Sequence, residues 1–198
     1  MRFKLTIPKE TKHTEAVNCV GWTTSDEFYS IADDHIINRS NLVNNEVMKV
    51  TELPGDFYPT DMHWFPKSNI GGKKIGSPDI FAMGSSDGKF LIMSKNGKIE
   101  KSVEAHKGAC ICVKWSHDGS MLLTGGEDGQ VKLWSKSGNL RSTLAQTSGP
   151  IYSVAWSPDN DSVLFASGKT LTIKPLSTNA KSNAVSTCFL QSYSIKLN

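Results

Sequence analysis

A histidine, a hydroxyl and a carboxylate are the residues whose types could do chemistry together in this chain. His106 and Asp128 lie 22 residues apart, and Thr124 lies between them. A carboxylate can orient an imidazole, and an imidazole can act as a general base, so the pair could be offered as catalytic partners. No nucleophile with its own base and orienting group accompanies them. We therefore predict no catalytic residues and no enzyme activity.

The four cysteines give no sign of a metal site or a disulfide framework. They stand at positions 19, 110, 112 and 188, without a Cys-x-x-Cys pair and without a histidine cluster at ligand spacing. Such spacing lies outside the usual zinc patterns. We expect reduced thiols in a cytosolic compartment, with no metal and no cofactor.

The composition argues against a nucleic-acid or membrane partner. The chain has 198 residues, 38% of them apolar, and its 22 basic and 19 acidic residues give a net charge of +3. This balance is too even for a nucleic-acid-binding surface. The opening segment MRFKLTIPKETKHTE turns polar early and leaves no apolar stretch for a signal peptide or a membrane span. We expect a soluble, intracellular protein with no nucleic acid, no membrane insertion and no small-molecule substrate.

The sequence contains four repeats, and the third of them includes His106, Thr124 and Asp128. Each repeat carries a tryptophan at the same phase, and the spacings between them are 42, 51 and 41 residues: Trp22, Trp64, Trp115 and Trp156. The longest spacing contains KSNIGGKKIGSPD, from Lys67 to Asp79, whose Gly, Lys and Pro residues predict a loop. A period of about 40 residues is typical of a β-propeller.

Within each repeat the pattern predicts short antiparallel strands. In ACICVKW the residues alternate in character, and MLLTGG is followed by the pair Asp128-Gly129 and then by QVKLW. Asp-Gly is a pair that a two-residue type I′ hairpin turn favours, because both central positions need positive φ. We predict an all-β partial propeller over residues 1–181, of about four blades near 13–45, 57–95, 106–140 and 149–177, followed by a divergent C-terminal tail over 182–198.

The third repeat, AHKGACICVKWSHDGSMLLTGGEDGQVKLWS, resembles the WD-repeat family from its opening histidine to its closing Trp-Asp position. The resemblance implies that four side chains form the hydrogen-bonded tetrad of that family: His106, Thr124, Asp128 and Trp134. The carboxylate would hold the imidazole, the imidazole would meet the hydroxyl, and the hydroxyl would reach the indole N–H, so that buried polar groups are paired. The implied role is structural.

The other repeats depart from this pattern. The first keeps His13, Ser30 and Asp34 as a partial tetrad, but Ser40 stands where the tryptophan would fall. The second has Met93 at that place and no opening histidine, and the fourth lacks the Asp-Gly pair. We expect a complete tetrad in the third repeat, a partial one in the first, and none in the second and fourth.

Longer strings resemble the WD-repeat subunits of intraflagellar transport complex B over roughly residues 1–181. They include HTEAVNCVGWTTSDEFYSIADDH, YPTDMHWFPKS, SSDGKFLIMSKNGKIEKSVEAH and GEDGQVKLWSKSGNLRSTLAQ, which the fold alone does not require. The resemblance implies a non-catalytic scaffold for protein–protein interaction that is needed for cilium assembly and maintenance. It implies other complex B subunits as partners, and a location in the cytoplasm and the cilium, at the basal body and axoneme.

Alternatives stay open at this point. One is a WD-repeat adaptor or coat subunit outside the cilium. Another is an enzyme on a propeller scaffold, against which the aspartates at repeated hairpin turns and the absence of a Gly-rich phosphate loop argue. A third is a non-assembling splice product, because SNAVSTCFLQSYSIKLN after Lys181 carries no His, Trp or Asp-Gly. Within that tail, CFLQSYSI could pair as a strand on the fourth blade.

The number of repeats also predicts which surfaces are exposed. Four blades are few for closing a ring, so we expect two blade faces to be left open. Candidate contact surfaces are the Lys67–Asp79 insertion and the hairpin loops 95–98 and 136–139. The two loops also suit ordinary solvated turns.

Overall fold

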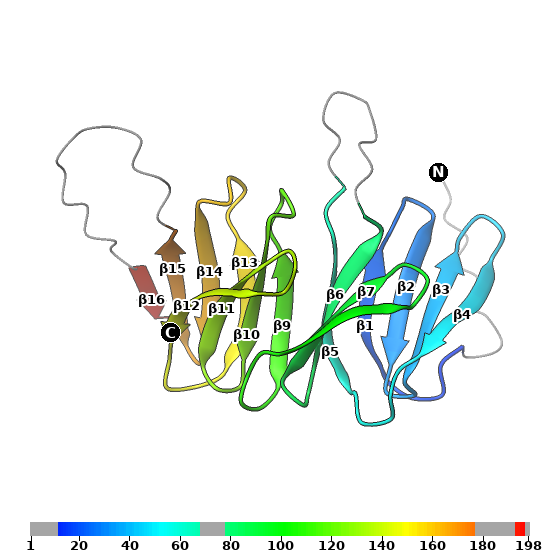
Figure 1. The fold of residues 1–198 in the computed structure, drawn as a ribbon, viewed down its shortest axis with the longest axis horizontal. Coiled ribbons are helices and arrows are strands. Elements are labelled where there is room, and N and C mark those ends of the chain that lie inside the picture. Colours follow the sequence, from blue (N-terminus) through cyan, green and yellow to red (C-terminus); the bar gives the residue numbers. More distant parts are fainter. Residues whose placement is uncertain (1–11, 68–77, 177–192, 197–198) are drawn as a thin grey trace.

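The regular structure is all β, as the sequence predicted (Figure 1). A computed structural model of the chain describes residues 12–67, 78–176 and 193–196. Within these ranges it contains strands and turns and no helix. The core of the expected insertion, residues 68–77, and most of the tail, residues 177–192 and 197–198, lie outside the described residues.

The strands form four antiparallel sheets, each a meander of consecutive strands. We call these sheets blades 1 to 4 in chain order. Blade 1 contains β1 (Val17–Trp22), β2 (Glu27–Ala32), β3 (Ile36–Asn41) and β4 (Glu46–Glu52). Blade 2 contains β5 (Pro59–Trp64), β6 (Ile80–Ser85), β7 (Lys89–Ser94) and β8 (Ile99–Glu104). Blade 3 contains β9 (Cys110–Trp115), β10 (Met121–Gly126), β11 (Gln130–Ser135) and β12 (Leu140–Gln146).

Blade 4 contains β13 (Ile151–Trp156), β14 (Ser162–Ser167), β15 (Thr170–Pro175) and β16 (Tyr193–Lys196). The strand β16 comes from the C-terminal tail and pairs antiparallel with β15, with Leu171 opposite Ile195. Part of the CFLQSYSI stretch is therefore a strand of the fourth blade, as its β pattern suggested.

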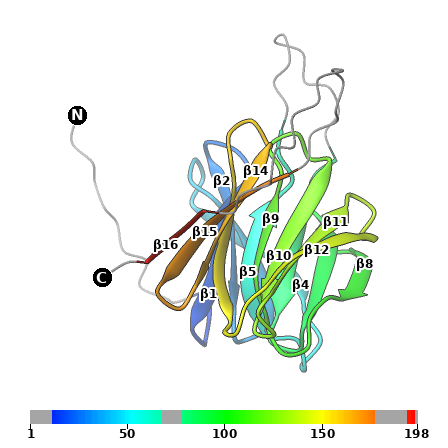
Figure 2. The same cartoon turned by 90° about the vertical axis from the view of Figure 1, so that its left-hand side faces the viewer.

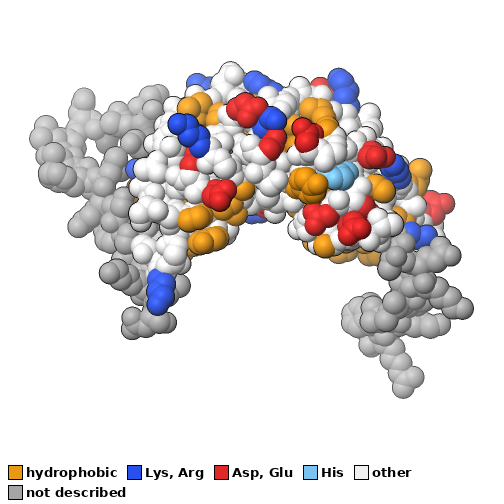
Figure 3. Space-filling view, turned by 90° about the horizontal axis from the view of Figure 1, so that it is seen from below, with side chains coloured by type: hydrophobic (Ala, Val, Ile, Leu, Met, Phe, Trp, Pro, Cys, Tyr) orange, Lys and Arg blue, Asp and Glu red, His pale blue; other side chains and the backbone are white. Residues whose placement is uncertain are grey.

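The four blades stand side by side with their first strands together. Strand β5 contacts both β1 and β9, and β9 contacts β13. Figures 1 and 2 show the blades fanning out from these strands. Seen from below, the described residues form an arch that is hollowed between its two ends (Figure 3). This arrangement is a partial propeller.

Each sheet extends beyond the residue range expected for its blade from the sequence. The expected ranges 13–45 and 57–95 end before β4 and β8 begin, the outermost strands of blades 1 and 2. These strands are largely exposed and polar, as EVMKVTE and IEKSVE show. An outer strand packs against little, so its sequence need not carry the alternation of a half-buried strand.

The apolar core lies between successive blades. Tyr29, Ile31 and Ile37 of blade 1 pack with Phe81 and Met83 of blade 2. Two further clusters of the same kind join blade 2 to blade 3 and blade 3 to blade 4. Because burial of apolar surface drives each contact, a blade is stabilised mainly by its neighbours.

Candidate functional site

The four predicted tetrad residues of the third repeat come together in blade 3. Thr124 lies on β10, Trp134 on β11, Asp128 in the turn between them, and His106 just before β9. His106 Nδ1 lies 2.9 Å from Asp128 Oδ1, and His106 Nε2 lies 2.8 Å from Thr124 Oγ1. The indole N–H of Trp134 donates to the same hydroxyl oxygen at 2.9 Å. The structure thus links all four side chains in one chain of hydrogen bonds.

The carboxylate and the burial of the ring together favour one state of the imidazole. A carboxylate can only accept, so the proton of a neutral His106 lies on Nδ1, directed at Asp128. His106 Nε2 then accepts from the hydroxyl of Thr124, which in turn accepts from Trp134. Burial lowers the pKa of His106 despite the nearby Asp128, which agrees with a neutral ring.

The hairpin turn holds the carboxylate in place. Asp128 accepts hydrogen bonds from the amides of Lys107 and Gln130, each at 3.1 Å. Burial alone would raise its pKa, but these amides and His106 together lower it. The next residue, Gly129, has a φ of 75°, the left-handed region that glycine adopts without strain. The charged Asp128 therefore accepts a hydrogen bond from the imidazole N–H of His106.

Blade 1 contains the shorter version that the sequence indicated. His13 Nε2 lies 2.8 Å from Ser30 Oγ, and His13 Nδ1 lies 3.0 Å from Asp34 Oδ2. The side-chain amide of Asn38, which pairs with Ser30 as Lys132 pairs with Thr124 in blade 3, lies 3.3 Å from His13 Nε2. Ser40, the residue expected at the tryptophan position, makes no hydrogen bond to this group among those described. Sequence spacing alone did not indicate Asn38.

Blades 2 and 4 place other residues at the threonine position. Thr124 pairs with Val113 in blade 3, and the same register places Met83 in blade 2 and Phe165 in blade 4. Both side chains are buried and apolar. Phenylalanine has no donor or acceptor and the thioether of methionine is only a weak acceptor, so these blades rely on apolar packing at this point.

The burial of the tetrad limits what it can do. The His106 side chain is 0% exposed and Thr124 is fully buried. A substrate cannot reach either group, so the arrangement suits a structural role. Among the described residues, no three His, Cys, Asp or Glu side chains are grouped to hold a metal ion. Nor does any helix in the described ranges have the length and apolar character to cross a membrane.

Polar contacts between blades form a second set that the sequence did not reveal. Asp61 on β5 accepts hydrogen bonds from the Val113 amide at 3.0 Å and the Lys114 ammonium at 2.9 Å, both on β9. His63 Nδ1 accepts from the Trp115 amide at 3.0 Å. These contacts depend on the register between two blades, and that register has no local sequence signal.

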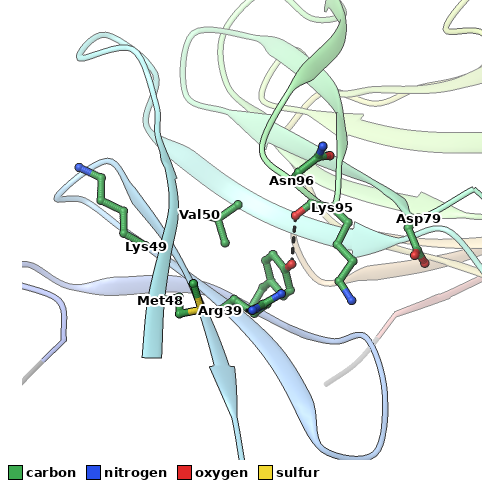
Figure 4. Close-up of a pocket in the computed structure, with 8 residues that line it drawn as sticks. Arg39, Met48, Lys49, Val50, Asp79, Lys95 and Asn96 are labelled. Atoms are coloured by element: carbon green, nitrogen blue, oxygen red, sulfur yellow. Dashed lines mark hydrogen bonds between the residues drawn. The ribbon is translucent and has the colours of Figure 1, made fainter. Parts of the chain in front are cut away.

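A groove of about 470 Å³ opens between the outer parts of blades 1 and 2 (Figure 4). Tyr29, Met48 and Val50 supply apolar surface, and Tyr29 donates its hydroxyl to the Lys95 carbonyl at 3.0 Å. Arg39 and Lys95 bring charge to the rim, where both lie near Glu27, at 3.6 and 2.6 Å. The surface combines an apolar centre with charges of both signs.

The hairpin loops proposed as contact surfaces occupy different settings. Lys95 and Asn96 of loop 95–98 border the groove. In loop 136–139 the Lys136 ammonium lies over the ring of Phe65, 4.5 Å from its centroid. Both loops border a concave surface, since Lys136 and Ser137 line a second hollow of about 520 Å³ together with Ser120, Ser135 and Arg141.

The matches to known proteins agree with this fold. Residues 97–135 and 138–174 match the family described as WD40, WD domain, G-beta repeat. The match shows two WD40 repeats within the chain, and the four antiparallel sheets make the fold a partial β-propeller. The chain is also 56% identical over 181 residues to the intraflagellar transport protein 80 homologs of Mus musculus and Rattus norvegicus. The resemblance to an intraflagellar transport protein inferred from the sequence is confirmed at this level.

The match covers most of this chain but a small part of each relative. The aligned 181 residues are 91% of this chain but 23% of each relative. The chain therefore spans about a quarter of the length of the relatives that it matches.

Proposed function

We propose that this chain is a non-catalytic protein–protein interaction scaffold and acts as a subunit of intraflagellar transport complex B, needed for cilium assembly and maintenance. The observation that carries the proposal is the 56% identity over 181 residues to two intraflagellar transport protein 80 homologs. Its partners are other complex B subunits. It acts in the cytoplasm and the cilium, at the basal body and axoneme.

The structure supports a scaffold through its rigidity. Apolar clusters join each blade to the next, and side-chain to backbone bonds such as Asp61 to Val113 fix their relative positions. A surface that does not rearrange loses little conformational entropy when a partner binds. The only tetrad-type groups in the described residues are buried inside blades, where they stabilise the surface and take no part in chemistry.

The groove between blades 1 and 2 is the surface we assign to a complex B partner. Its apolar centre fits one or two apolar side chains, and its rim charges fit flanking residues of either sign. An extended peptide segment of another subunit has this chemistry. Met48 is 51% exposed, so a substitution there tests best whether the groove binds a partner.

The test is affinity purification of the tagged chain from ciliated cells, with imaging of the same tag. We expect complex B subunits to be recovered and the tag to reach the basal body and axoneme. Met48→Glu should reduce that recovery, while Val43→Glu, at a 75% exposed site away from the groove, should leave it unchanged. Enrichment of ligase or vesicle-coat subunits in place of complex B would refute the ciliary proposal, and equal recovery by both variants would refute the groove.

A further inference from the structure

The second hollow, of about 520 Å³, lies at one end of blade 3, and we call it the blade 3 hollow. Its lining comes from the turn after β9, the end of β11 with the turn that follows, and the start of β12: Ser120, Ser135, Lys136, Ser137 and Arg141. The two turns lie together because β9 to β12 are consecutive antiparallel strands. Blades 2 and 4 pack on the two faces of blade 3, so the hollow does not arise from an open blade face.

The hollow gathers positive charges that no carboxylate neutralises. Lys136 and Arg141 are exposed, and neither has a carboxylate within 4 Å among the described residues. The Lys136 ammonium instead lies 4.5 Å from the centroid of the Phe65 ring. A third cation, Lys101 on β8 of blade 2, donates to the Ser137 carbonyl and likewise forms no ion pair within the described ranges. Three positive charges therefore surround one hollow.

The equivalent turn of blade 2 shows the opposite arrangement. In the strand register of the two blades, Lys95 takes the place of Lys136, and Glu100 takes the place of Arg141. Lys95 pairs with Glu27 of blade 1 at 2.6 Å, and Glu100 pairs with a lysine of its own turn at 3.2 Å. Blade 2 thus neutralises its turn and blade 3 does not. Charges of one sign repel each other, and a bound anion removes that repulsion.

Two serines of the lining keep one hydroxyl proton for a ligand. The hydroxyl oxygens of Ser135 and Ser137 lie 3.0 Å apart, so one hydroxyl donates to the other. The Ser135 oxygen also accepts from the Asn139 amide at 3.1 Å, and the Ser137 oxygen accepts from the Asn139 side-chain amide at 3.3 Å. Whichever serine donates within the pair, the proton of the other hydroxyl has no acceptor among the described residues. That proton is a hydrogen-bond donor for an anion.

One acid, Asp118, is hydrogen-bonded to the lining, and its charge is already satisfied within its own turn. Asp118 Oδ1 accepts from the Ser116 hydroxyl at 2.6 Å, from the Ser120 amide at 3.0 Å and from the Ser120 hydroxyl at 2.9 Å. Burial alone would raise the pKa of Asp118, but these donors lower it. The three cations around the hollow therefore remain in excess.

We propose that the blade 3 hollow binds an acidic segment of a partner protein, whose Asp or Glu carboxylates meet Lys101, Lys136 and Arg141 and accept the free serine proton. The hollow is much larger than a single carboxylate, and its cations come from β8, a turn and β12, so it suits several carboxylates in succession. A nucleic acid would need a longer basic surface than a chain of net charge +3 provides. This inference does not depend on the proposed ciliary function.

The test is fluorescence anisotropy with a labelled peptide of alternating glutamate and glycine, at about 0.1 M salt, where exposed charges still act over about 10 Å. We expect binding that Arg141→Glu weakens by more than about tenfold, because the variant places like charges in contact. Lys136→Gln should weaken binding less, since it removes a charge without adding repulsion. Lys107→Glu is the matched control, because Lys107 is also exposed but lies before β9, at the opposite end of that strand from Ser120. It should leave binding unchanged.

Further probes separate an acidic-peptide site from general charge attraction. A peptide with glutamine in place of glutamate keeps the size but not the charge, and should not bind. The Arg141 side chain is exposed, so circular dichroism should show the same unfolding temperature for Arg141→Glu and wild type. Absence of binding by the wild type, or equal losses in Arg141→Glu and Lys107→Glu, would overturn the proposal. Tighter binding of single-stranded RNA or of vesicles with anionic lipid, lost in Arg141→Glu, would also overturn it.

Discussion

Trp134 donates its indole N–H to the hydroxyl oxygen of Thr124, 2.9 Å away, and both side chains are buried in blade 3. The same blade contains a second buried tryptophan, Trp115, whose indole N–H has no hydrogen-bond partner among the described residues. Each indole packs edge-on against a phenylalanine, with centroids 5.1 Å apart for Trp134 and 5.2 Å for Trp115. The two tryptophans differ chiefly in one hydrogen bond.

The first prediction uses this difference. Trp134→Phe removes the donor and leaves Thr124 with one bond fewer in a buried site, which should lower the free energy of unfolding by roughly 1 to 3 kcal/mol. Trp115→Phe removes a similar ring volume but no hydrogen bond, and should cost less. Urea unfolding of both variants measures the two values. Equal losses would show that the hydrogen bond adds no stability.

The second prediction concerns the hydroxyl at the centre of the tetrad. Thr124→Val keeps the shape of the side chain but leaves both His106 Nε2 and the Trp134 indole without a partner. An unpaired buried polar group costs about 1 to 3 kcal/mol, so the loss should exceed that of Trp134→Phe. Thr124→Ser is the control, because Ser30 fills the equivalent place in blade 1. If Ser and Val variants unfold at the same urea concentration, the hydroxyl does not link the tetrad.

The third prediction separates backbone strain from steric clash at two turns. Gly129 and Gly168 both have positive φ, 75° and 55°. An added Cβ at Gly129 would lie 2.4 Å from the Thr147 carbonyl oxygen, while one at Gly168 would have nothing within 4 Å. Gly168→Ala should cost about 1 kcal/mol, the penalty of the left-handed region. Gly129→Ala should cost more, and thermal unfolding of the two variants compares them.

The fold could be predicted from the sequence because the same residue pattern occurs in each repeat. Four tryptophans at one phase and the Asp128-Gly129 turn are local features, while the resemblance of the third repeat to the WD-repeat family implied that His106 and Asp128 are hydrogen-bonded partners. The link from Asn38 to His13 was not predicted, because Asn38 pairs with Ser30 at a position where the third repeat has Lys132, outside the tetrad pattern.

Exposure could not be predicted in the same way. Trp22 and Trp115 have the same repeat position, yet one is 59% and the other 1% exposed. Within the described residues blade 2 covers Trp115 and no blade covers Trp22, which is a property of the arrangement and not of the repeat. For the same reason the groove between blades 1 and 2 and the contacts of Asp61 had no sequence signal.

The last prediction concerns acid, through the contact between blades 2 and 3. His63 Nδ1 accepts the Trp115 amide and must be neutral to do so. Burial lowers the pKa of His63 to about 4, with Lys114 and His117 acting in the same direction and Asp61 against it. The unfolded chain has the ordinary histidine pKa of about 6.5. As the pH falls from about 6.5 to about 4, the unfolded state therefore takes up a proton that the folded state excludes, and stability decreases.

His63→Asn isolates this effect, since asparagine keeps an acceptor at the same distance from the main chain but does not titrate. Between pH 7 and pH 4.5 the wild type should lose about 2 kcal/mol more unfolding free energy than the variant, as measured in urea. The lowered pKa of His106 acts on both proteins alike and cancels in the comparison. An identical loss in the two proteins would mean that His63 is not held neutral by burial, and the contact between β5 and β9 would then need another explanation.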